Sequence, residues 1–284
     1  MARKKALVVV CGPTASGKSE LSDALAEELT GELGARVPTL VVDSMQVYRE
    51  IPAITNQARR RPAELVGIAS VTEEWTVARH RERAQEIIAG TDTPFVLDCG
   101  TGMYLNAILL DVPLAPKVED QTRRVAQEIT AGAPNPRRAS RAKELELAGV
   151  PDRRSIWDGD LRYNATIIYL RPNRAQLNAA ISKRSRRIVR DGLEEATKLG
   201  EMRGVNASVM DSIGVSELVE HLEGKMTIEE AQVRISTRTR KLARRQIRWF
   251  DKLARTLQGR ADINVAKSPA DVDILNYMHD IMRV

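Results

Sequence analysis

Residues 12–19 are Gly12-Pro13-Thr14-Ala15-Ser16-Gly17-Lys18-Ser19, which fits the phosphate-binding loop (P-loop) pattern G-x-x-x-x-G-K-[ST]. The apolar run 6–11 before it predicts a buried strand, and the apolar spacing of residues 18–29 predicts a helix after it. In this context the glycines let backbone N–H groups turn inward, and the helix N-terminus adds partial positive charge. Lys18 can reach terminal phosphate oxygens, and the Ser19 hydroxyl can bind Mg²⁺. We therefore expect this loop to bind a phosphate-bearing small molecule.

Further strand and helix patterns alternate along the chain. Residues 39–43, 94–98 and 166–170 are short apolar runs bounded by turn residues, and residues 77–89 have helical spacing. Continuous apolar strands suit a parallel sheet that is covered on both faces. We predict an α/β fold, in which a doubly wound parallel sheet forms a P-loop core.

The pattern changes in residues 113–162, which hold five prolines and many charges. Helical spacing occurs there at about 121–130 and 138–147, but no strand pattern does. We predict a small helical insertion at 113–162 within a core of residues 1–112 and 163–258. The core is expected to be helical after residue 170, and residues 259–284 to be a C-terminal tail.

Composition excludes several classes of protein. With 43% hydrophobic and 29% charged residues, the chain is typical of a globular protein. No apolar run approaches the ~18 residues of a membrane span, so we expect a cytoplasmic protein without membrane contact. Cys11 and Cys99 each end an apolar run and are expected to be buried, and the three histidines lack ligand spacing. The net charge of +6 includes arginine clusters such as 59–61, which can neutralise phosphates.

Two predicted strands end in residues that can carry chemistry. Asp43 ends one strand, and Asp98-Cys99-Gly100-Thr101-Gly102 ends another. Ligands of open α/β sheets bind beyond the carboxyl ends of the strands, so both segments should lie beside the P-loop. Asp43 could hold Mg²⁺ through water or accept a proton, and Thr101 could bind a substrate group. Turn formation by Asp43 and helix capping by Thr101 are the structural alternatives.

The ordered motifs resemble the signatures of tRNA dimethylallyltransferases. Besides the P-loop, they are Asp43-Ser44-Met45-Gln46-Val47-Tyr48 and Gly100-Thr101-Gly102-Met103-Tyr104-Leu105. Weaker matches follow in the same order: Pro136-Arg137-Arg138 with Arg141-Ala142, Ile213-Gly214, and Arg244-Arg245-Gln246-Ile247-Arg248-Trp249-Phe250. The resemblance extends over about residues 7–250.

This resemblance implies an enzyme that transfers the dimethylallyl group of dimethylallyl diphosphate to N6 of adenine 37 in tRNA, and releases diphosphate. The P-loop would then hold the leaving diphosphate instead of ATP. Asp43 would accept the N6 proton, Thr101 would orient the amine and Lys18 would stabilise the leaving group. The implied diphosphate ligands are Gly12, Thr14, Ala15, Ser16, Gly17, Lys18, Ser19 and Arg184, with Mg²⁺ on Ser19.

The resemblance also implies a tRNA partner, bound through its anticodon stem-loop by a monomeric enzyme. The adenine must leave its stack to react, which costs a few kcal/mol and is least costly in a loop. The implied contacts with tRNA and adenine are Asp43, Ser44, Met45, Gln46, Arg137, Arg138, Arg141, Arg245 and Gln246.

Three departures from the family pattern leave alternatives open. Asp98-Cys99 stands where the family has Val-Gly, Ser216 stands where it has a basic residue, and the insertion is shorter than usual. One alternative is an adenylate dimethylallyltransferase, which would make cytokinin-type products from AMP, ADP or ATP; the arginine clusters argue against it. Another is a P-loop small-molecule kinase, in which residues 43–48 would have no purpose. A third is an RNA-binding homologue without turnover.

Overall fold

The computed structural model describes residues 4–134, 136–150 and 155–274. The chain divides into two compact units. The core consists of residues 1–109 and 161–284, and the inserted unit consists of residues 110–160. These boundaries lie close to those expected for the insertion at 113–162.

The core is built on a six-stranded sheet in the order β3-β2-β4-β1-β5-β6. All neighbouring strands pair in parallel. This confirms the predicted α/β fold with a parallel sheet. The strands are β1 (Ala6–Cys11), β2 (Thr39–Val42), β3 (Ala63–Glu64), β4 (Phe95–Cys99), β5 (Asn164–Leu170) and β6 (Asp262–Ala266).

Strand β6 lies within residues 259–284, which were expected to form a tail. It extends the sheet as an edge strand beside β5, with Ile263 opposite Ile167 and Ala266 opposite Leu170. Most of its side chains are exposed or half-exposed. A short edge strand needs no continuous apolar run, so its sequence carries little strand signal.

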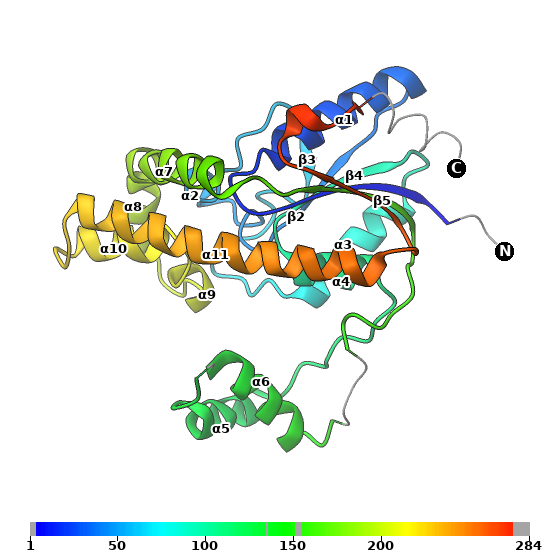
Figure 1. Ribbon diagram of the computed structural model, residues 1–284. Coiled ribbons are helices and arrows are strands. Elements are labelled where there is room, and N and C mark those ends of the chain that lie inside the picture. The colour runs from blue at the N-terminus through cyan, green and yellow to red at the C-terminus, as the bar shows by residue number, and fades with distance from the viewer. Residues whose placement is uncertain (1–3, 135, 151–154, 275–284) are drawn as a thin grey trace. The chain divides into compact units, whose positions relative to one another are not determined.

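Helices cover both faces of this sheet. In Figure 1, α1 lies on one side of the sheet, and α3, α4 and α11 lie on the other. Leu21, Leu25 and Leu29 of α1 pack into one buried cluster with Val8 of β1 and Ile168 of β5. The helices of the core are α1 (Lys18–Leu33), α2 (Pro52–Thr55), α3 (Val77–Ala89), α4 (Gly102–Leu109), α7 (Arg174–Asp191), α8 (Leu193–Glu201), α9 (Ala207–Met210), α10 (Val215–Leu222) and α11 (Ile228–Leu257).

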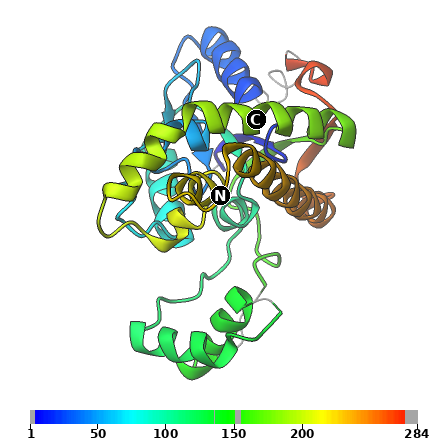
Figure 2. The ribbon, with the colours of Figure 1, turned by 90° about the vertical axis from the view of Figure 1, so that its left-hand side faces the viewer.

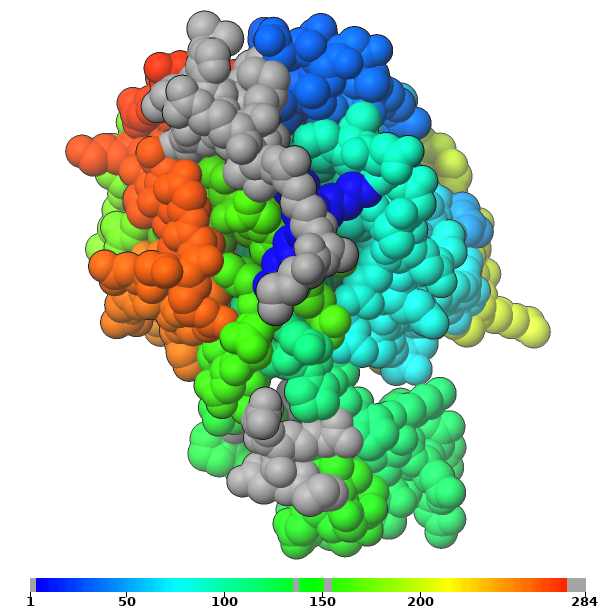
Figure 3. Space-filling model, turned by 90° about the vertical axis from the view of Figure 1, so that its right-hand side faces the viewer, coloured from blue at the N-terminus to red at the C-terminus, as the bar shows by residue number. Residues whose placement is uncertain are grey.

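The later helices gather at one end of the core. Figures 1 and 2 show α7, α8 and α10 there, together with the first turns of α11. Strand β1 runs toward this end, so the carboxyl ends of the strands face these helices (Figure 1). At the other end, the start of β1 lies between the last turns of α11 and α3, in blue, orange and cyan in Figure 3.

The inserted unit is helical. It contains α5 (Asp120–Thr130) and α6 (Pro136–Leu147), which pack against each other. Both helices lie at the positions where the apolar spacing predicted them. None of the helices in the described part of either unit combines the length and the apolar composition that a membrane span requires.

Candidate functional site

The P-loop connects the central strand β1 to α1 and curls through left-handed backbone conformations. Gly17 has a φ of 87° and immediately precedes α1, and Ala15 has a φ of 64°. Gly12 needs its missing side chain, because a Cβ there would lie 2.5 Å from the carbonyl oxygen of Leu170. The Ser16 hydroxyl is buried and has no hydrogen-bond partner among the residues that the structure describes. A buried polar atom without a partner marks a place where a ligand can bind.

Lys18 is the buried cation of this loop. Its ammonium group donates a hydrogen bond to the carbonyl oxygen of Pro13, at 2.8 Å. Burial lowers the pKa of Lys18, whereas the negative charges of Asp98 and Asp43 act in the opposite direction. The loop thus holds its lysine at the carboxyl edge of the sheet, where the charges of Asp98 and Asp43 act on it.

Asp43 follows β2 and has one carboxylate oxygen tied to the backbone. Oδ1 accepts hydrogen bonds from the N–H groups of Met45, at 2.8 Å, and Gln46, at 3.3 Å. Oδ2 lies against Gly100, where an added Cβ would be only 2.8 Å away. Burial raises the pKa of Asp43, although these hydrogen bonds and the charges of Lys18 and Arg184 lower it. A fixed carboxylate with a raised pKa is a suitable general base.

Thr101 and Arg184 complete the predicted centre. The Ser44 N–H donates to the Thr101 hydroxyl at 3.2 Å, which connects the loops after β2 and β4. Arg184 comes from α7, donates to the carbonyl oxygen of Thr55 at 3.4 Å and interacts electrostatically with Asp43. The fold therefore brings Lys18, Asp43, Thr101 and Arg184 to one end of the sheet from four separate segments.

Asp98 lies in β4 and is compensated by a cation. The Ser19 hydroxyl donates to Asp98 Oδ2 at 2.7 Å, and Arg59 Nη1 pairs with the same oxygen at 2.5 Å. Arg59 Nη2 also pairs with Asp23 of α1, at 2.7 Å. The Asp98 carboxylate, which the family pattern lacks, is therefore held by Ser19 and Arg59. The sequence showed Arg59 only as part of a basic cluster, and it gave no signal for Asp23.

Gln246 of α11 lies beside the P-loop. Its amide oxygen accepts from the Thr14 N–H at 2.8 Å, and its amide nitrogen donates to the Gly100 carbonyl oxygen at 2.7 Å. Gln246 was expected to contact RNA. Its side chain instead joins the P-loop to the loop after β4, so an RNA contact of Gln246 stays a prediction.

The other residues expected to contact tRNA fall into two groups. Ser44, Met45 and Gln46 follow Asp43, and Oε1 of Gln46 is buried without a hydrogen-bond partner in the described part of the chain. In the inserted unit, Arg138 is exposed, and Arg141 pairs with Glu144 at 2.7 Å. The side chain of Arg137 lies outside the described residues.

A line of basic side chains follows α11, and we call it the basic stripe. Its members recur every three or four residues and thus share one helix face over about 30 Å. All are exposed or half-exposed. They are Arg234, Arg238, Lys241, Arg245, Arg248, Lys252 and Arg255.

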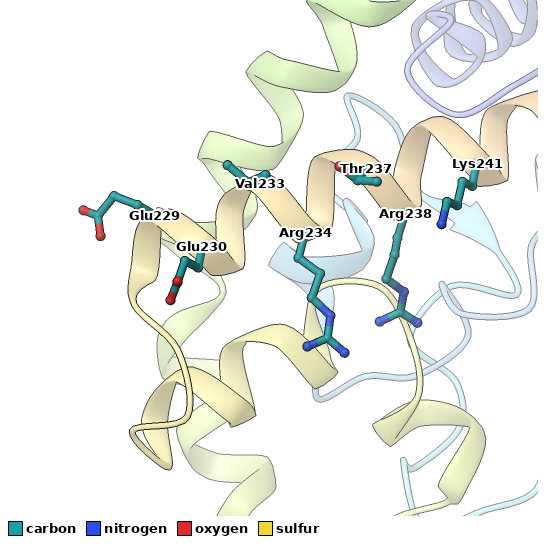
Figure 4. Close-up of a pocket in the computed structure, with 7 residues that line it drawn as sticks. All are labelled: Glu229, Glu230, Val233, Arg234, Thr237, Arg238 and Lys241. Atoms are coloured by element: carbon teal, nitrogen blue, oxygen red, sulfur yellow. The ribbon is translucent and has the colours of Figure 1, made fainter.

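The stripe begins at a shallow groove along the first turns of α11, which exposed Val233 also lines (Figure 4). Arg238 points away from α11 in this view and pairs with buried Glu217 of α10 at 2.6 Å. It also donates to the Ser216 hydroxyl at 2.5 Å. The guanidinium group of Arg238 thus lies beside Ser216, the residue at which the family pattern has a basic side chain.

Comparison with known proteins identifies the family. The model of the IPP transferase family matches residues 46–134 and 114–253. The tRNA dimethylallyltransferase of Rubrobacter xylanophilus is 58% identical over 288 residues, which cover 99% of each chain. The chain belongs to the IPP transferase family. The tRNA dimethylallyltransferase of Synechocystis is 30% identical, over 89% of this chain and 90% of the relative.

Two solved IPP transferase structures share the fold. The tRNA isopentenylpyrophosphate transferase of Bacillus halodurans is 25% identical, with a TM-score of 0.69 over 99% of this chain and 95% of that one. The corresponding protein of Staphylococcus epidermidis is 22% identical, with a TM-score of 0.67 over 99% and 98% of the two chains. The chain therefore shares the fold of these two proteins.

Proposed function

We propose that this IPP transferase moves the dimethylallyl group of dimethylallyl diphosphate to N6 of adenine 37 in tRNA and releases diphosphate. The main support is the juxtaposition of Lys18 and Asp43, since the charge of each acts on the pKa of the other. An anion-binding loop next to a half-buried carboxylate suits a reaction that expels an anion and removes a proton. The full-length relative that is 58% identical is named a tRNA dimethylallyltransferase.

The P-loop would bind the diphosphate as it leaves. Departure builds negative charge on the diphosphate oxygens, and the Lys18 ammonium and the loop N–H groups would stabilise that charge. The unpartnered Ser16 hydroxyl offers a further donor. Arg184 on α7 would neutralise part of the diphosphate charge, and its half-buried position strengthens that effect.

A divalent cation fits this loop, and we propose Mg²⁺. The Ser19 hydroxyl, which donates its proton to Asp98 and keeps its lone pairs, provides an oxygen ligand of the kind that Mg²⁺ prefers. When bound, the ion would neutralise charge on the leaving diphosphate. Ser19 would be the protein ligand.

The adenine amine would be activated by residues of the loops that follow β2 and β4. Asp43 would accept the N6 proton through Oδ2, because its Oδ1 is held by two backbone N–H groups. Thr101 would orient the amine, and the unpartnered Gln46 Oε1 would accept a hydrogen bond from the base. The adenine would leave its stack to reach these groups.

The basic residues support tRNA as the acceptor. The basic stripe on α11 and the arginines of α6 provide cations along extended surfaces, which suits a polyanion better than a single nucleotide. The comparisons give no support to the adenylate dimethylallyltransferase or the kinase. A cytoplasmic location and a monomeric state stay predictions.

One experiment compares these acceptors. Dimethylallyl diphosphate labelled in its carbon chain is offered to total tRNA, AMP and ATP in parallel, with Asp43→Ala as the inactive control. We expect label in tRNA, in N6-substituted adenosine at position 37. Preferential labelling of AMP would favour the nucleotide enzyme, and phosphate transfer from ATP without carbon transfer would favour the kinase. RNA binding without any transfer would indicate a homologue that does not turn over.

A further inference from the structure

Ser19 of the P-loop contacts a buried ionic cluster that the proposed chemistry does not use. We call Asp23, Arg59 and Asp98 the Asp98 cluster. Arg59 pairs with both carboxylates, at 2.7 Å and 2.5 Å. The side chains of Asp23, Arg59 and Asp98 are only 4%, 5% and 3% exposed. These charges are therefore paired within the protein and hardly reach solvent.

The charges of this cluster do not balance. Two carboxylates face one guanidinium, which leaves one net negative charge next to Ser19. An uncompensated buried charge is costly, so a further cation nearby is favourable. The positive charge of Lys18 acts on Asp98 and partly offsets this negative charge, although its ammonium group donates its hydrogen bond to the carbonyl oxygen of Pro13 and not to the carboxylate. Asp98 therefore adds a negative charge next to Ser19, which would favour a divalent cation there.

The hydrogen bond between Ser19 and Asp98 also orients the serine. A hydroxyl has one proton to donate and two lone pairs. Ser19 gives its proton to Asp98 Oδ2, at 2.7 Å, so its lone pairs point away from Asp98. Arg59 binds the same carboxylate oxygen at 2.5 Å and keeps it in place. A partner that fixes a metal ligand in this way tunes the affinity of the site.

We propose that Asp98 is a positioning residue for the divalent metal: it orients the Ser19 hydroxyl as a ligand and adds negative charge behind it, while Arg59 and Asp23 hold Asp98. This inference rests on the proposed function, because it assumes that the P-loop binds a metal with diphosphate. Asp98 would thus place a carboxylate behind the metal ligand Ser19, at a position where the family pattern has valine.

The test measures metal binding without catalysis. Mn²⁺ is titrated into the full chain with one equivalent of inorganic pyrophosphate, and free Mn²⁺ is followed by electron paramagnetic resonance against a protein-free blank with the same pyrophosphate. Asp98→Asn and Asp98→Val are compared with wild type. The matched control is Glu27→Gln, which changes an exposed carboxylate one turn after Asp23 in α1. We expect Mn²⁺ affinity to fall about 10- to 100-fold in Asp98→Val and less in Asp98→Asn, which keeps an acceptor for Ser19. Glu27→Gln should leave it unchanged.

A double-mutant cycle keeps the test decisive if Asp98→Val fails to fold. In a Ser19→Ala background, Asp98→Asn should lose most of its effect on Mn²⁺ affinity, because the hydroxyl that Asp98 orients is gone. Circular dichroism checks that each variant is folded. Unchanged Mn²⁺ affinity in folded Asp98→Asn, or an equal effect of that substitution with and without Ser19, would overturn the inference.

These outcomes separate the inference from the proposed function. Unchanged Mn²⁺ affinity in an Asp98 variant that still modifies tRNA would overturn the inference alone. Tight, Asp98-dependent Mn²⁺ binding in a wild-type chain that transfers nothing to tRNA would overturn the proposed function alone. A wild-type chain that binds no pyrophosphate would overturn both.

Discussion

The amide oxygen of Gln246 accepts a hydrogen bond from the backbone N–H of Thr14, at a distance of 2.8 Å. The amide nitrogen of the same side chain donates to Gly100 O, at 2.7 Å. Gln246 thus joins two loops that carry Lys18 and Thr101. A catalytic centre that is assembled from several segments depends on such supporting contacts.

Gln246→Ala should lower kcat/KM for dimethylallyl transfer about tenfold, which corresponds to about 1.4 kcal/mol. The reason is the loss of two hydrogen bonds of about 1 kcal/mol each, part of which the loops recover by binding water. Steady-state kinetics with tRNA would measure it, with Gln258→Ala at the exposed end of α11 as the control. Weaker RNA binding with unchanged kcat would instead assign Gln246 to RNA recognition.

Asp43→Asn should lower the single-turnover rate by about 10²- to 10⁴-fold, while affinity for dimethylallyl diphosphate changes little. Burial raises the pKa of Asp43, so wild-type activity should fall with decreasing pH at a higher pH than an ordinary aspartate would give. The rate is measured against pH in both proteins. The acid limb should vanish in Asp43→Asn, and its persistence there would exclude Asp43 as the base.

The same raised pKa makes a prediction about stability. Folded Asp43 binds its proton more tightly than unfolded Asp43, so its contribution to stability is present below the unfolded pKa of about 3.9 and is lost as the pH rises through the folded pKa. Asp43→Asn removes this loss and should unfold at higher urea concentration than wild type at pH 7. The difference should shrink as the pH approaches 4. A wild type that is the more stable protein at pH 7 would contradict this.

Gly102→Ala tests the packing of α4 on α11. An added Cβ would lie 2.2 Å from Cδ1 of Trp249, whose indole N–H donates to Asn106 of α4 at 3.1 Å. We expect a loss of about 1–3 kcal/mol in the free energy of unfolding from overpacking. Gly31→Ala is the matched control, because Gly31 is helical and its Cβ would meet nothing within 4 Å. That variant should gain about 0.5–1 kcal/mol. Equal stability of the two variants would refute the predicted clash.

The basic stripe should bind RNA phosphates. Arg245→Ala and Arg248→Ala should each weaken binding of an anticodon stem-loop and reduce the slope of log K against log salt by about 1. Fluorescence anisotropy over a range of salt concentrations measures the slope. Lys198→Ala removes an exposed cation from α8, outside the stripe, and should leave the slope unchanged. Identical slopes in all four proteins would exclude phosphate contacts at positions 245 and 248.

Features that depend on neighbouring residues in the chain could be predicted from the sequence. The P-loop motif and the buried strands predicted β1, α1 and the parallel sheet. The carboxyl-end rule for such sheets predicted that Asp43 and Thr101 would approach the P-loop. Each of these predictions rested on residues that lie close together in the sequence.

Features that depend on distant pairings could not be predicted in this way. Arg59 reaches Asp98 across 39 residues, and Arg238 reaches Ser216 from the next helix along the chain. The sequence shows an added acid at 98 and a missing base at 216, but it does not show the arginines that offset them. Gln246 was likewise assigned from its motif, while its partners lie 232 and 146 residues away.

Donor labelling tests whether the P-loop holds a leaving diphosphate. Dimethylallyl diphosphate carrying ¹⁴C in the allyl chain and ³²P in the diphosphate is incubated with the enzyme and tRNA, with no ATP present. We predict ¹⁴C in N6-substituted adenosine of the tRNA and all ³²P in free diphosphate, in equal amounts, and neither product with Lys18→Ala. Transfer of ³²P to the acceptor, or a requirement for ATP as a phosphate donor, would contradict a diphosphate leaving-group site.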